Sequence, residues 1–128
     1  HAGGRKLVSV RFRNPWLKER EMALGAFVTL KPKPGAAQEL RERVLEVAEA
    51  VRDEPGNLLT LAFSDPENPD HMVMLELFRD QAAIEEHRVA RSSVELGPAV
   101  HALLAEPMTI KRLLALDWPT AASRARSA

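Results

Sequence analysis

Two neighbouring segments near the middle of the chain follow the two-residue period of β-strands. Residues 57–64 (NLLTLAFS) and 71–78 (HMVMLELF) carry apolar side chains at most positions, so both faces of each strand are largely apolar. The residues between them, 65–70 (DPENPD), are typical of a turn and predict a hairpin. Because a solvated face would alternate with polar residues, both faces must be covered. We expect helices of the same chain on one face, and a partner subunit or a ligand-filled cavity on the other.

The same alternation predicts strands at the two ends of the central region, over 22–30 and 108–116. After the first of these strands, Pro32 and Pro34 end the pairing, because neither can donate a hydrogen bond to a sheet. A helix then runs to about Arg52, since apolar side chains recur there at intervals of three and four residues. Its expected buried stripe is Leu40, Val44, Val47, Ala48 and Val51.

Short helices are predicted after the hairpin. Asp80 can cap the first of them, and Ser92 with Glu95 has the spacing of a capping box for the next. Pro98 cannot lie deep within a helix without the loss of a hydrogen bond, so we expect a kink or a new start there, and a helix to about Ala105. The predicted order is strand, helix, two strands, helices, strand.

This order predicts a ferredoxin-like α+β fold. Right-handed crossovers in two strand–helix–strand halves place the helices on one face of a four-stranded antiparallel sheet. The other face is bare and apolar, so we expect two subunits to press their sheets together in a closed dimeric α/β barrel. The domain would cover 22–116, between a basic N-terminal arm or extra strand at 1–21 and a C-terminal tail at 117–128. Trp16 offers the arm a large apolar contact, which would allow an oligomer higher than a homodimer; the alternative is a mobile leader.

Composition excludes several classes of protein. The length of 128 residues suits a single domain, the absence of cysteine excludes disulfides and thiol catalysis, and no apolar run approaches the ~20 residues of a membrane helix. Residues 1–21 contain six Lys or Arg and two Glu, whereas residues 53–106 contain eleven acidic residues and three arginines. An acidic body argues against nucleic acid. We therefore expect a soluble, cytoplasmic protein with neither a membrane nor a nucleic-acid partner.

The turns and caps resemble those of the antibiotic biosynthesis monooxygenase domain family, which belongs to the dimeric α/β-barrel superfamily. The matching motifs are KPG at 33–35, EPGN at 54–57, DP at 65–66, ELF at 76–78 with Asp80, Ala83 with EH at 86–87, and AEP at 105–107. The resemblance covers 22–116 and implies the fold and the dimer. The family includes oxygenases that act on quinols or polyketide-like phenols without metal or flavin, haem-degrading relatives, isomerases of small signalling sugars, and members of unknown role.

His87 is the candidate catalytic residue. It shares a helical face with Ala83, Ile84 and Ala90, so its imidazole should point into the apolar interior, where it could act as a base. The alternative is a core histidine whose ring is satisfied by a backbone carbonyl. Because this position matches the histidine that the family commonly carries, the resemblance implies the catalytic role.

Other residues are candidates for binding a substrate. Asn57 and Thr60 could donate hydrogen bonds to a bound oxygen atom, although Asn57 also suits a turn. Phe78 stands where relatives often carry Trp or Tyr, and His101 lies at the edge of an apolar stripe.

Glu76 is a further substrate-binding candidate, because it interrupts the apolar face of its strand. A lone carboxylate there must find a partner or raise its pKa. A cross-strand ion pair is the expected explanation, with Arg112 in the last strand as one partner.

The resemblance implies a cofactor-independent monooxygenase that uses dioxygen and a small aromatic substrate. The four histidines are scattered without metal-ligand spacing and no glycine-rich phosphate loop occurs, so we expect no metal, flavin or nucleotide cofactor. The chain has no tyrosine, which excludes any mechanism that uses a tyrosine hydroxyl. The alternatives are a non-enzymatic small-ligand binder, a structural dimer, and a haem-binding relative. The haem interpretation depends on His101 alone as the axial ligand. A cavity beside His87 of roughly 300 Å³ or more would favour the enzyme.

Overall fold

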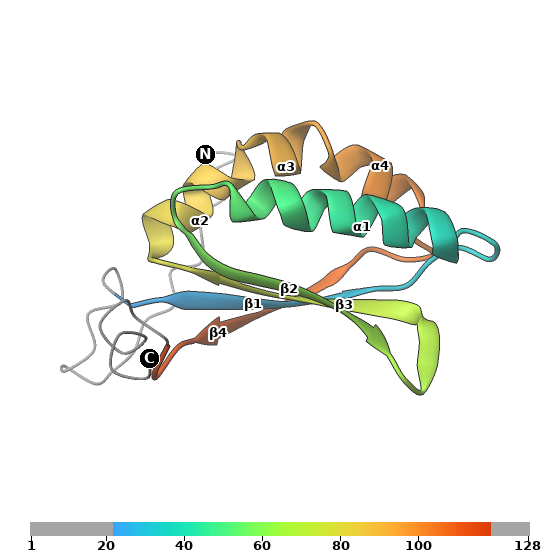
Figure 1. Cartoon of the computed structure of the whole chain (residues 1–128), viewed down its shortest axis with the longest axis horizontal. Coiled ribbons are helices and arrows are strands. Elements are labelled where there is room, and N and C mark those ends of the chain that lie inside the picture. Colours follow the sequence, from blue (N-terminus) through green and yellow to red (C-terminus); the bar gives the residue numbers. More distant parts are fainter. Residues whose placement is uncertain (1–21, 119–128) are drawn as a thin grey trace, which may run out of the picture.

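The computed structural model describes residues 22–118, so the predicted N-terminal arm at 1–21 and the end of the C-terminal tail lie outside the described residues. The helices all lie on one face of the sheet (Figure 1). In chain order the elements are β1 (Leu24–Leu30), α1 (Ala37–Arg52), β2 (Asn57–Asp65), β3 (Asn68–Phe78), α2 (Gln81–Arg88), α3 (Arg91–Val94), α4 (Gly97–Ala102) and β4 (Thr109–Leu114).

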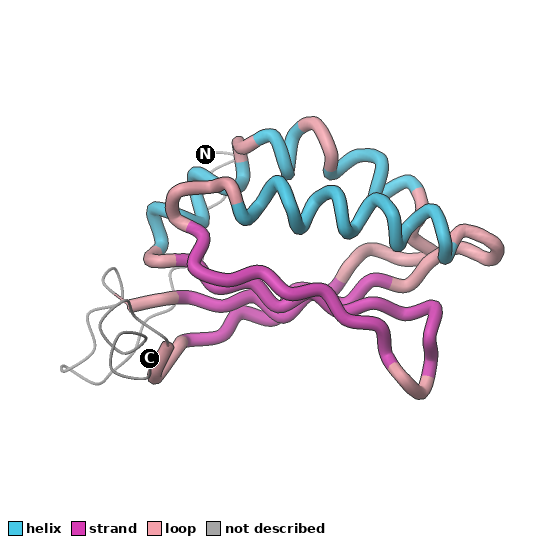
Figure 2. Tube along the Cα trace, viewed as in Figure 1, coloured by secondary structure: helices cyan, strands magenta, loops and turns pink. Residues whose placement is uncertain are grey.

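The four strands form one antiparallel sheet in the order β2-β3-β1-β4. Figure 2 shows two layers, with the helices over the strands. This arrangement confirms the predicted α+β ferredoxin-like fold, in which the two halves of the chain each contribute an outer and an inner strand. The dimeric barrel and the division of the chain into arm, domain and tail stay predictions.

Helix α1 begins two residues after Gly35, whose φ of 80° lies in the left-handed region that glycine adopts without strain. The loop that holds Gly35 is fixed by the other half of the chain. The N–H of Lys33 donates to the carbonyl of Leu103. The N–H of Ala105 donates to the carbonyl of Lys31. The predicted stripe of α1 faces the sheet, with Leu40, Val44, Ala48 and Val51 buried and Val47 partly buried.

The turn of the β2–β3 hairpin is shorter than predicted. Asp65 pairs with Asn68, which leaves two residues in the turn, and the Asp65 carboxylate accepts a hydrogen bond of 2.9 Å from the N–H of Glu67. Pro69 is tolerated within β3 because the pairing of β3 with β1 begins only at Met72, three residues after the proline. The hairpin therefore extends past the rest of the sheet (Figure 1).

One of the two predicted caps is correct. The Asp80 carboxylate accepts a hydrogen bond of 2.9 Å from the N–H of Ala83 and caps α2. The capping box of Ser92 and Glu95 is wrong: α3 starts after Ala90 without a side-chain cap, and the Ser92 hydroxyl donates elsewhere. A new helix does start at Gly97–Ala102 with proline in its first turn, although it ends three residues before the predicted Ala105.

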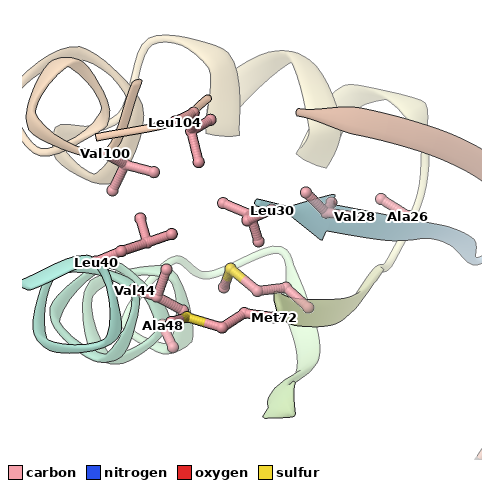
Figure 3. Close-up of a cluster of buried hydrophobic side chains, with 10 residues drawn as sticks. Ala26, Val28, Leu30, Leu40, Val44, Ala48, Met72, Val100 and Leu104 are labelled. Carbon is pink, nitrogen blue, oxygen red and sulfur yellow. The ribbon is translucent and has the colours of Figure 1, made fainter. Parts of the chain in front are cut away.

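The core fills the space between the two layers. Figure 3 shows side chains of α1, β1 and the α4 region converging on it. The larger cluster comprises Ala26, Val28, Leu30, Leu40, Val44, Ala48, Met72, Met74, Val100 and Leu104. A second cluster surrounds Phe78 and includes Leu24, Val51, Ala83 and Ile84. The second cluster supports α2, which carries the candidate catalytic histidine.

The sheet face opposite the helices is mostly apolar, and the described residues 22–118 leave it largely uncovered. Phe27 pairs with Leu75, and Leu75 pairs with Leu61, so three large side chains form a row across this face. Phe63 is 49% exposed. We call this surface the bare face; its other large apolar residues are Leu59, Val73, Leu77 and Leu113.

Candidate functional site

A cavity of about 330 Å³ lies between the helices and the sheet. Residues from every element except β2 line it. Most of the lining is apolar, as in Val28, Met74, Val100 and Ile110. The polar side chains that line it are Glu76, His87, Arg88, Ser92, Ser93, His101 and Arg112. Such a mixture of apolar walls and a few polar groups is typical of a small-molecule site.

His87 lies in the last turn of α2 and borders this cavity, as the helical pattern predicts. Its Nδ1 is 2.8 Å from Oε1 of Glu54, and its ring centroid is 4.9 Å from that of Phe78. An ionised carboxylate can only accept a hydrogen bond, so Nδ1 carries the proton of the neutral ring. The lone pair of the neutral imidazole is then on Nε2, for which the described residues provide no hydrogen-bond partner. The ring is thus held by a carboxylate rather than by a backbone carbonyl, and it can accept a proton.

Glu54 is a site residue that the sequence pattern did not reveal. It lies in the turn between α1 and β2, and its side chain is only 14% exposed. One carboxylate oxygen faces His87, and the other accepts a short hydrogen bond from the hydroxyl of Ser92. The turn reaches α2 because Gly56 packs against Ala83, where a Cβ on Gly56 would come within 2.3 Å of the Ala83 Cβ. Its place in the EPGN motif was the only sequence signal, and turn chemistry explains that motif equally well.

Glu76 is buried beside the cavity, with 7% of its surface exposed. Burial raises the pKa of its carboxyl; the nearby Glu54 also raises it, while His87 and Arg112 lower it. The expected cross-strand ion pair with Arg112 is not formed, because Ala26 of β1 lies between the two residues in the sheet register. Among the described residues, no cation lies within ion-pair distance of Glu76. Its carboxyl is therefore biased toward the neutral form, which can donate a hydrogen bond.

Of the other predicted binding residues, the structure places two at the cavity and two away from it. Phe78 is buried below the His87 ring, and the exposed His101 of α4 also borders the cavity. Asn57 does not line the cavity; its amide donates to the carbonyls of Leu59 and Leu77, at the irregularity where β2 begins. Thr60 does not line it either. Its hydroxyl is buried without a hydrogen-bond partner in the described part of the chain.

Metal-binding clusters and membrane-spanning helices are both absent from the described residues. Residues 22–118 contain no group of three or more His, Cys, Asp or Glu side chains placed to hold a metal ion. Within the same range, no helix has the length and apolar character needed to cross a membrane.

Comparison with known proteins identifies relatives of the chain. No curated protein matches it. A solved structure of an antibiotic biosynthesis monooxygenase is 26% identical with a TM-score of 0.68, over 73% of this chain and 99% of that one. A structure from Pseudomonas aeruginosa is 25% identical with a TM-score of 0.70, over 78% of this chain and 100% of that one. A protein of unknown function from Nitrosomonas europaea shares the fold, with 22% identity and a TM-score of 0.68 over 79% and 96%.

The family assignment rests on a sequence model that spans β1 to α3. The model of the family described as antibiotic biosynthesis monooxygenase matches residues 24–93, a range that holds Glu54, Glu76 and His87. Since this match covers more than half of the chain, the protein belongs to the antibiotic biosynthesis monooxygenase family.

Proposed function

We propose that the protein is a cofactor-independent monooxygenase that oxidises a small electron-rich aromatic compound, a quinol or a polyketide-like phenol. The observation that carries this proposal is the imidazole of His87, held by Glu54 at 2.8 Å, at the wall of a largely apolar cavity of about 330 Å³. This volume exceeds the roughly 300 Å³ at the lower end of small-ligand pockets. Family membership supports the same reaction class.

The reaction begins with proton transfer. Nε2 of His87 removes the proton of a phenolic hydroxyl, and the Glu54 carboxylate on Nδ1 stabilises the imidazolium that forms. The phenolate gives one electron to dioxygen, and the aryloxyl radical and superoxide combine at a ring carbon. The imidazolium protonates the resulting peroxide. Loss of the ring proton and cleavage of the O–O bond then yield a quinone and water, so one oxygen atom enters the product and the other leaves as water.

The surroundings of His87 suit this sequence of steps. Apolar walls limit the access of water to the radical pair, which would otherwise release superoxide. In its neutral form Glu76 can donate a hydrogen bond to a substrate oxygen, and burial favours that form. Phe78 packs against the imidazole and helps to fix its orientation.

Oxygen consumption tests this proposal. We expect a screen of quinols and polyphenols to give uptake of dioxygen that His87→Ala lowers by about 10²–10⁴-fold, as is typical for loss of a general base. His71→Ala is the matched control, because His71 lies in β3 outside the cavity lining. Uptake that His87→Ala leaves unchanged would remove the catalytic role. Binding of aromatics without any uptake would instead identify a ligand-binding protein.

A further inference from the structure

Two arginines that are exposed to solvent line the same cavity as His87. Arg88 ends α2, and Arg112 lies in β4 on the face of the sheet toward the helices. Neither forms an ion pair or a hydrogen bond with another described residue. Each other arginine within the described range, by contrast, contacts an acidic side chain or a backbone carbonyl; these are Arg41, Arg43, Arg52, Arg79 and Arg91.

The two positive charges lie close enough to act on each other. Burial lowers the pKa of Arg112, and the charge of Arg88 lowers it further. Glu76 is the acidic group that partly offsets this effect, but Ala26 separates it from Arg112 in the register and burial biases its carboxyl toward the neutral form. One side of a mostly apolar cavity therefore carries positive charge that the described residues do not neutralise. An anion bound there would relieve the repulsion.

Carboxylate is the anion that best suits this arrangement. A guanidinium group presents a planar fork of N–H donors that matches the two oxygens of a carboxylate. The apolar walls, among them Val28, Met74 and Ile110, suit a ring system attached to that carboxylate.

We propose that the ligand of this cavity is a hydroxyaromatic carboxylate, bound with its carboxylate against Arg88 and Arg112 and its hydroxyl toward His87. This inference rests on the proposed function, because it assigns the substrate class of the same cavity. Arg88 and Arg112 then determine specificity, while His87 carries out the proton transfer.

Two probes separate the contribution of the charge from that of the ring. 6-Hydroxy-2-naphthoate and 2-naphthol share the ring and the hydroxyl and differ only in the carboxylate. We expect isothermal titration calorimetry at neutral pH to show that the wild-type protein binds the naphthoate about 10- to 100-fold more tightly, as charge-assisted hydrogen bonds provide.

Charge-removing variants locate that preference. Arg88→Gln and Arg112→Gln should each weaken binding of the naphthoate about tenfold and change the affinity for 2-naphthol by less than about twofold. Arg91→Gln is the matched control, because it removes the same charge three residues after Arg88 from a side chain that pairs with Glu95 and does not line the cavity. It should change neither affinity.

Three results would overturn the inference: equal affinity for both probes, a preference that survives in both cavity variants, or no binding of either probe by the wild-type protein. The readout is binding alone, so it separates this inference from the oxygenase reaction. Naphthoate preference without oxygen uptake would refute the oxygenase and keep the ligand class. Oxygen uptake that depends on His87, without any preference, would refute the ligand class alone.

Discussion

At the scale of single residues, Glu76 links the stability of the protein to pH. Its carboxyl is buried beside His87, Glu54 and Arg112, and burial is the largest cause of its raised pKa. The folded state therefore binds the Glu76 proton more tightly than the unfolded chain does. Between the ordinary pKa of a glutamate and the raised value, stability falls as pH rises, because ionisation of a buried carboxyl favours the unfolded chain.

This linkage predicts the behaviour of Glu76→Gln. The variant keeps the shape of the neutral side chain and cannot ionise, so its free energy of unfolding relative to wild type should rise as pH rises through that window. Urea denaturation from about pH 4 to about pH 8 measures this difference. Glu85→Gln, which alters an exposed carboxylate on α2, should show no such trend. A difference that is independent of pH would mean that Glu76 ionises in the folded protein as readily as in the unfolded chain.

At the scale of elements, the contact between the turn before β2 and helix α2 brings Glu54 and His87 together. Gly56 in that turn leaves no room for a Cβ, because a Cβ would meet Ala83 at 2.3 Å. The backbone N–H of Arg79 also donates to the carbonyl of Gly56. Close approach at this point allows Glu54 to reach His87, although the two residues are 33 positions apart.

A methyl group at Gly56 tests this contact. Gly56→Ala should lower the free energy of unfolding by about 1–3 kcal/mol, the usual cost of overpacking, and should lower activity because it moves Glu54 away from His87. Gly97→Ala serves as the control for stability, since its added Cβ meets nothing closer than 3.8 Å. Thermal or urea unfolding of both variants gives the comparison. Equal free energies of unfolding for the two variants would show that α2 and the turn can move apart without loss of stability.

The order and type of the elements could be predicted from the sequence because both depend on local patterns. Three examples are the stripe of α1, the cap at Asp80 and the restart at Pro98. Each depends on residues that are close together in the sequence. Ser92 shows the limit of that reasoning. Its spacing from Glu95 fits a capping box, but its hydroxyl is closer to a stronger acceptor, the carboxylate of Glu54.

The candidate site was predicted only in part, for the same physical reason. His87 borders the cavity, as its helical face predicts, and the other candidates Glu76, Phe78 and His101 also line it. The pairing of His87 with Glu54 depends on how tightly two elements distant in sequence pack together. No local periodicity carries that information.

At the scale of the whole molecule, the bare face is an extended apolar surface without a covering layer among the described residues. Its side chains come from all four strands, and the row from Phe27 through Leu75 to Leu61 lies across it. A monomeric protein rarely exposes a contiguous apolar surface of this kind. Packing of two such faces against each other would bury the large side chains of both subunits.

We expect light scattering to give a homodimer for the wild-type protein. Leu61→Lys should shift the population toward monomer, because it would bury a charge at the contact between the two faces. Leu45→Lys, which places the same charge on an exposed leucine of α1, should leave the dimer intact. A monodisperse wild-type monomer at micromolar concentration would contradict the barrel.

The regular pairing of the sheet has a consequence for how this sequence can vary. Across the paired strands, even-numbered residues such as Glu76 and Arg112 face the helices, whereas odd-numbered ones such as Phe27 and Leu75 face the opposite side. The proposed catalysis and the expected self-association would thus depend on alternating residues of the same short segments. A substitution can alter one property and spare the other, but deletion of a single residue within β3 would exchange the two sets. Both properties would be lost in one mutational step.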